Sequence, residues 1–116
     1  SENRTPAQQK LFGRVGGKLK APSAFSFALH GYDSVLLLAQ AIRQAGSTDG
    51  VAVRTALEDL KTPVEGVRKP YDRPFSRTDH EALTAKDFVW IKWKDGKLMP
   101  YSDAITAGFT PADFKK

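Results

Sequence analysis

Two histidines and several serines are the side chains in this sequence that could support nucleophilic chemistry. A catalytic site would pair His30 or His80 with a serine such as Ser34 or Ser76, so that the imidazole removes the hydroxyl proton. Neither serine lies in a nucleophile elbow, and no run of glycines beside them supplies an oxyanion hole. We therefore expect no enzymatic activity and assign no catalytic residue.

Metal and phosphate sites also lack the required residues. The sequence has no cysteine, and its two histidines stand far apart among scattered aspartates, whereas a metal site needs three or four ligands at organised spacing. The glycine-rich stretch 13–18 ends in lysine but lacks the spacing of a phosphate-binding loop, and no strand is expected before it. The sequence predicts neither a metal nor a cofactor.

The net charge of +5, from 18 Lys and Arg against 13 Asp and Glu, raises the possibility of nucleic-acid binding. The basic residues form no single helical stripe, so a solvated surface is the preferred interpretation. Trp90 and Trp93 flank Lys92, but strand alternation directs the two indoles to opposite faces and so favours core packing over base stacking. A free-standing basic α+β module that binds nucleic acid remains the alternative.

A pair of helices is the strongest structural signal in the sequence. A helix from about residue 28 to Ala45 carries apolar residues on two faces and therefore requires cover on both sides. Gly46 suits a left-handed residue after the helix, and Asp49 or Thr48 can cap a second helix, which Pro63 stops. The pair is expected to span residues 28–61.

Weaker patterns predict the remaining elements. Thr5 and Pro6 predict a short N-terminal helix that ends before Gly13, and a second cap signal at Thr110 and Pro111 predicts a helix in the C-terminal tail. A single short strand is expected at 65–69 within a long loop, and Asp95-Gly96 should join strands 87–94 and 97–101 as a hairpin.

The order and spacing of three motifs resemble one protein family. They are Gly31-Tyr32-Asp33 before the long helix, Ala45-Gly-Ser-Thr-Asp-Gly50 between the helices, and Trp93-Lys-Asp-Gly-Lys97 in the hairpin. From about Phe25 to Tyr101, the sequence is similar to the Leu/Ile/Val-binding proteins, the periplasmic substrate-binding proteins of branched-chain amino acid ABC transporters, which have the type I periplasmic-binding fold.

The resemblance implies an α/β fold class and a fragment. The chain would be one partial domain with three or four helices and a small antiparallel β-hairpin. Residues 1–84 would form mainly one lobe, and residues 85–116 the last crossover, the hairpin and the tail. A signal peptide would lie upstream on the full-length protein, which would act in the periplasm and deliver its ligand to an ABC permease.

The resemblance also implies site residues. Phe27 would pack against the apolar side chain of a bound branched-chain or related amino acid, with Phe25 as the alternative one turn away and His30 at the border of the same cleft. The fragment would supply only one wall of the cleft and should not bind ligand alone. After Asp72 the family usually has an Asp-x-x-Gly turn, whereas this chain has Arg73–His80, which leaves the ligand subtype open.

A fragment of this kind should not remain a monomer. The apolar residues Leu36, Leu37, Leu38 and Ile42 would form one exposed patch without the strands of the missing part, and strand 87–94 would have an open edge. We expect a dimer or a segment-swapped assembly in which one chain covers the other.

Overall fold

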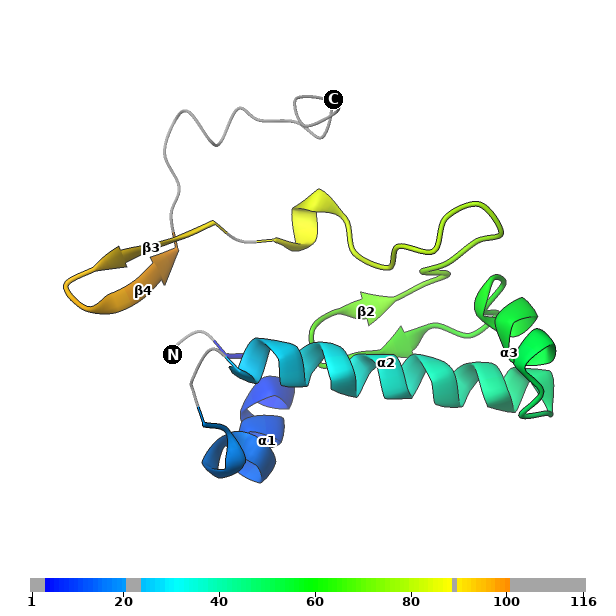
Figure 1. Cartoon of the computed structure of the whole chain (residues 1–116), viewed down its shortest axis with the longest axis horizontal. Coiled ribbons are helices and arrows are strands. Elements are labelled where there is room, and N and C mark those ends of the chain that lie inside the picture. Colours follow the sequence, from blue (N-terminus) through cyan, green and yellow to red (C-terminus); the bar gives the residue numbers. More distant parts are fainter. Residues whose placement is uncertain (1–3, 21–23, 89, 101–116) are drawn as a thin grey trace. The chain divides into compact units, whose positions relative to one another are not determined.

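A computed structural model describes residues 4–20, 24–88 and 90–100. These residues form three α-helices, two short 3-10 helices and two two-stranded antiparallel sheets (Figure 1). The predicted mixed α/β class is confirmed. The chain divides into two compact units, residues 1–82 and 83–116, and each is described by itself.

The first helix, α1, spans Pro6–Val15 and begins with a capping box. The Thr5 hydroxyl accepts a hydrogen bond from the Gln8 backbone N–H, and the Gln8 side chain accepts one from the Thr5 N–H. The prediction that the helix ends before Gly13 is wrong, because a single glycine inside a helix costs only about 1 kcal/mol. Leu11 packs in a core cluster with Phe25 and Leu29, and a 3-10 turn, η1 (Gly16–Lys18), follows the helix.

The long helix α2 spans Ala24–Ala45, and α3 spans Gly50–Leu57. The two helices pack against each other, as predicted. Gly46 has a φ of 61°, and the Asp49 carboxylate accepts hydrogen bonds from Val51 and Ala52, so both predicted turn signals are confirmed. The predicted start near residue 28 is wrong by one turn, because Phe25 is drawn into the core cluster and the helix extends back to cover it.

A small hairpin, not a single strand, follows α3. Strand β1 (Val64–Glu65) pairs antiparallel with β2 (Pro70–Tyr71), with Val64 opposite Tyr71. Residues 66–69, predicted as the body of a strand, form the turn between them. The prediction failed because an isolated run of alternating residues does not reveal where the chain reverses. In Figure 1 this hairpin runs alongside α2, with which β1 is in contact.

The second unit contains a 3-10 turn, η2 (Ala85–Asp87), and a hairpin of β3 (Ile91–Lys94) and β4 (Lys97–Pro100). Asp95 and Gly96 have φ values of 51° and 71°, the positive pair that a type I′ turn requires, so the predicted Asp-Gly turn is confirmed. Trp90 and Trp93 are 59% and 71% exposed. The expected core packing of these rings is wrong, because the described residues of this unit, 83–88 and 90–100, provide no second layer against the two-stranded sheet.

Among the described residues, no helix combines the length and the apolar character that a membrane span requires. The helix predicted at Thr110 and Pro111 lies outside the described residues.

Candidate functional site

Phe27 is an exposed aromatic side chain in the first turns of α2. Its side chain is 76% exposed, although phenylalanine is normally among the most buried residue types. The residues one, two and three turns further along this face are Gly31, Val35 and Leu38, and both Val35 and Leu38 are exposed. Between residues 27 and 38, α2 therefore presents an apolar face that the described residues of the first unit leave exposed.

Phe25 lies on the opposite side of the same helix. It is only 7% exposed and meets the Phe12 ring edge to face, with 5.1 Å between the ring centroids. The Arg4 guanidinium lies 3.8 Å from the centroid of Phe12 and 5.0 Å from that of Phe25. The structure thus separates Phe25 from Phe27, and Phe25 is held in the core of its own chain.

His30 lies three residues after Phe27 and is half-buried. Its Nε2 atom is buried and has no hydrogen-bond partner among the described residues. The backbone carbonyl of His30 accepts the Ser34 hydroxyl at 2.9 Å, so this serine is engaged with the backbone and not with the imidazole.

A buried carboxylate joins α2 to the turn of the β1–β2 hairpin. Asp33 is 1% exposed, and its Oδ1 accepts the Val67 backbone N–H at 2.6 Å. Its Oδ2 accepts the Arg68 backbone N–H at 2.9 Å and the Tyr71 hydroxyl at 3.0 Å. Charged acceptors form the stronger class of hydrogen bonds, so this arrangement, called the Asp33 clamp below, fixes the turn on the helix.

The Asp33 clamp leaves no room for a side chain at residue 66. A Cβ added to Gly66 would lie 2.5 Å from the Lys69 carbonyl oxygen, 2.6 Å from Asp33 Oδ2 and 2.6 Å from the Tyr71 ring. The turn also contacts α1, because the Gln8 side-chain amide donates to the Val67 carbonyl at 3.3 Å. Three elements therefore meet at residues 66–69.

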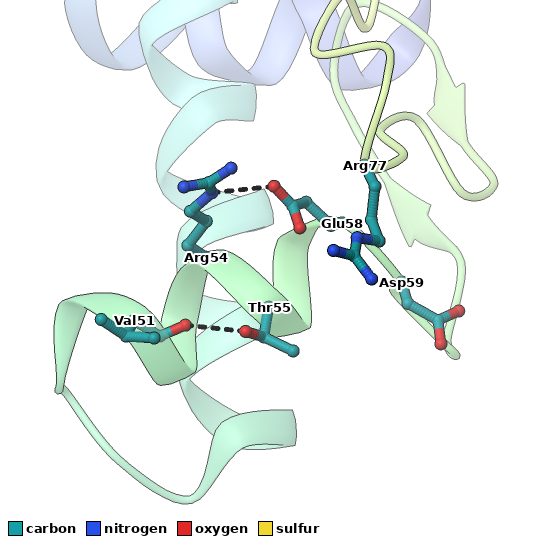
Figure 2. A pocket seen from close by; sticks show the side chains of 6 residues that line it. All are labelled: Val51, Arg54, Thr55, Glu58, Asp59 and Arg77. Atoms are coloured by element: carbon teal, nitrogen blue, oxygen red, sulfur yellow. Dashed lines mark hydrogen bonds and ion pairs between the residues drawn. The ribbon is translucent and has the colours of Figure 1, made fainter.

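A polar hollow of about 530 Å³ lies on α3 (Figure 2). Its lining carries two arginines and two carboxylates: Arg54, Arg77, Glu58 and Asp59. Arg54 Nε donates to Glu58 Oε1 at 2.8 Å, and this contact is the main reason that the pKa of Glu58 lies below its ordinary value. Asp59 forms an ion pair with Lys61, which lowers the pKa of Asp59 in the same way.

The described residues do not assemble a catalytic or metal site. The Ser76 hydroxyl accepts the Thr78 and Asp79 backbone N–H groups, and His80 contacts Glu58, so neither serine meets an imidazole. Within the described ranges, no three His, Cys, Asp or Glu side chains cluster as metal ligands.

Sequence reasoning missed the role of Asp33 and Gly66. A signal for Asp33 was present, because an aspartate inside an apolar helix is rarely buried without partners that compensate its charge. The partners could not be identified, since they are backbone N–H groups of a turn 34 and 35 residues away.

The family model described as periplasmic binding protein matches residues 2–97, which is most of the chain. Neither the curated proteins nor the solved structures gave a significant match.

Proposed function

The chain belongs to the periplasmic binding protein family, and from this premise we propose that it is part of the solute-binding component of an ABC transporter. Members of this family bind solutes outside the cytoplasm and generally make no chemical change to them. The proposed ligand is a branched-chain amino acid or a similar small amino or carboxylic acid, which the protein would deliver to a membrane permease.

The observation that carries the proposal is the exposed ring of Phe27. An aromatic ring left uncovered by its own chain loses favourable burial, whereas a ligand with an aliphatic side chain would cover it. His30, three residues further along the helix, is proposed to lie at the border of the same surface, with part of its side chain accessible and its Nε2 atom buried. The opposite wall, and the groups that hold the charged ends of the ligand, would come from outside this chain.

The mechanism would be a change of population between open and closed forms. A ligand that contacts two walls binds the closed form more tightly, and this difference in affinity sets how far the equilibrium moves. The closed form would then be the one that the permease recognises. No covalent step is required.

Replacement of Phe27 by alanine in the full-length protein tests the ligand wall. We expect the affinity for the ligand to fall by about 1–3 kcal/mol, because the ligand then covers less apolar surface. Isothermal titration calorimetry with leucine, isoleucine and valine would measure the change. Val51→Ala provides a control, since Val51 is equally exposed but lies on α3. A dissociation constant unchanged by Phe27→Ala would remove Phe27 from the site.

The exposure of Trp90 and Trp93 supports the alternative function, which is nucleic-acid binding. Both indoles are accessible beside Lys92, as a surface that stacks on bases would require. Titration with a single-stranded oligonucleotide at low and high salt distinguishes the two functions. Binding that weakens steeply with salt would support the alternative, and no binding at low salt would eliminate it.

The isolated 116-residue chain is expected to self-associate. Of the four residues predicted to form an apolar patch, Leu38 is exposed, Leu36 and Ile42 are half-buried, and Leu37 is buried; Phe27 and Val35 enlarge the patch instead. Covering one large apolar side chain contributes about 1.5–3 kcal/mol, and the burial of Phe27, Val35 and Leu38 together is what we expect to favour a dimer or a segment-swapped assembly. Analytical ultracentrifugation at micromolar concentration would measure the mass. A clean monomer with cooperative unfolding would contradict this prediction.

A further inference from the structure

Segment 72–82 follows β2 in the first unit. The segment is ordered by its own contacts: the Ser76 N–H donates to the Asp79 carbonyl at 2.7 Å, and the Ser76 hydroxyl accepts the Asp79 N–H at 3.0 Å. The Asp79 carboxylate accepts the Glu81 N–H at 2.9 Å. These bonds lie within the segment and define a local turn at residues 76–81.

A single carboxylate oxygen connects this segment to α3. His80 Nε2 lies 3.1 Å from Glu58 Oε1, the same oxygen that accepts Arg54 Nε at 2.8 Å. The Glu58 side chain is only 12% exposed, while that of His80 is 57% exposed. Glu58 is therefore the fixed partner, and His80 is the group that water and protons reach.

An apolar hollow lies beneath this contact. It has a volume of about 150 Å³, with Leu57 from α3 and Phe75 from the segment in its lining. Arg54, Glu58 and His80 complete the lining. Movement of the segment away from α3 would expose Phe75 and Leu57 to water. The contact between His80 and Glu58 and the apolar hollow therefore both require that the segment lie against α3.

We propose that His80 and Glu58 form a proton-dependent latch that holds segment 72–82 on α3. With a neutral imidazole the contact is an ordinary hydrogen bond in which Nε2–H donates, and a proton on the second ring nitrogen turns it into an ion pair. The proposal is independent of the ligand and transport function described above.

The charges around the latch are of both signs. On α3, Arg54 competes with His80 for the same Glu58 oxygen, and the adjacent Asp59 is paired with Lys61. On the segment, Arg77 lines the neighbouring hollow of Figure 2, and the carboxylates of Asp79 and Glu81 flank His80 in sequence. Glu58 is thus bonded by one permanent cation and by one group whose charge depends on pH.

The pH window follows from the two partners. The pKa of Glu58 lies below its ordinary value of 4.5, mainly because of the hydrogen bond with Arg54. The carboxylate is therefore ionised at any pH above 4.5. Its contact with His80 is lost on the acidic side only when the pH falls through this lowered pKa. Imidazole becomes positively charged when the pH falls, and the added charge strengthens its contact with a carboxylate. The latch is therefore strongest in mildly acidic solution and weaker above neutrality.

Hydrogen exchange of the intact chain, followed by mass spectrometry, tests the latch. Exchange in segment 72–82 is compared in mildly acidic solution, at about pH 5.5, and in mildly basic solution, at about pH 8, after correction for the intrinsic exchange rates. We expect about two- to fivefold greater protection at the lower pH, the range typical of one exposed ion pair. Protection in α3 serves as the internal reference.

Three variants make the test specific. Glu58→Gln and His80→Gln keep a polar side chain but remove the ion pair, so each is expected to abolish the pH dependence. Glu81→Gln removes a neighbouring exposed carboxylate and should retain it. Equal protection of wild-type segment 72–82 at both pH values, or a pH dependence that persists in Glu58→Gln, would overturn the proposal.

Discussion

Replacement of Asp33 by alanine is expected to lower the free energy of unfolding by about 3–5 kcal/mol, because three donors lose their acceptor and each buried donor left unsatisfied costs about 1–3 kcal/mol. The change would leave the Val67 and Arg68 N–H groups and the Tyr71 hydroxyl without their acceptor. Urea denaturation followed by circular dichroism would measure the loss.

Replacement of Asp33 by asparagine removes the carboxylate but keeps the size and shape of the side chain. It retains one acceptor oxygen, but its amide nitrogen must then face an N–H or a hydroxyl donor, so we expect a smaller loss of about 1.5–3 kcal/mol. Asp72→Asn, at an exposed position directly after β2, provides the matched control and should stay within about 0.5 kcal/mol of wild type. If Asp33→Ala were as stable as the control, the Asp33 clamp would have no part in stability.

The second large effect is expected at Gly66. Alanine there would place a methyl group 2.5 Å from the Lys69 carbonyl oxygen, a backbone atom that cannot rotate away. We expect the turn to shift and the free energy of unfolding to fall by about 2–3 kcal/mol, at the upper end of the usual cost of overpacking. The same denaturation experiment measures it.

Gly50→Ala provides the control for Gly66→Ala. A Cβ added at Gly50 would meet no other atom within 4 Å, and the residue lies in the first turn of α3. Alanine also has the higher helix propensity, so this variant should be at least as stable as wild type. A comparable loss of stability in both variants would show that crowding at Gly66 is not the cause.

Local signals in the sequence predicted the elements that depend on local interactions. The helix pair was predicted because apolar spacing, Gly46 and Asp49 act within a few residues of one another, and the Asp95-Gly96 turn was predicted for the same reason. The hairpin at 64–71 was mistaken for one strand, since its reversal at 66–69 is stabilised by Asp33, a residue from a distant helix.

The three residues proposed for the ligand site, Phe25, Phe27 and His30, lie on α2. Position along α2 suggested Phe27, Phe25 and His30 together, yet the helix directs Phe25 toward Phe12 and leaves Phe27 exposed. Sequence spacing alone does not fix which face of a helix the rest of the chain covers. The roles of Phe27 and His30 in ligand binding remain predictions.

The long sequence separation within the Asp33 clamp has a consequence for the order of folding. The bonds from Asp33 to residues 67 and 68 enclose the C-terminal part of α2 and the whole of α3. Contacts between α2 and α3 close shorter loops and lose less chain entropy, and once they have formed, the loop that the Asp33 clamp must close is effectively shorter. We therefore expect the native turn at 66–69 to form after the two helices have packed together.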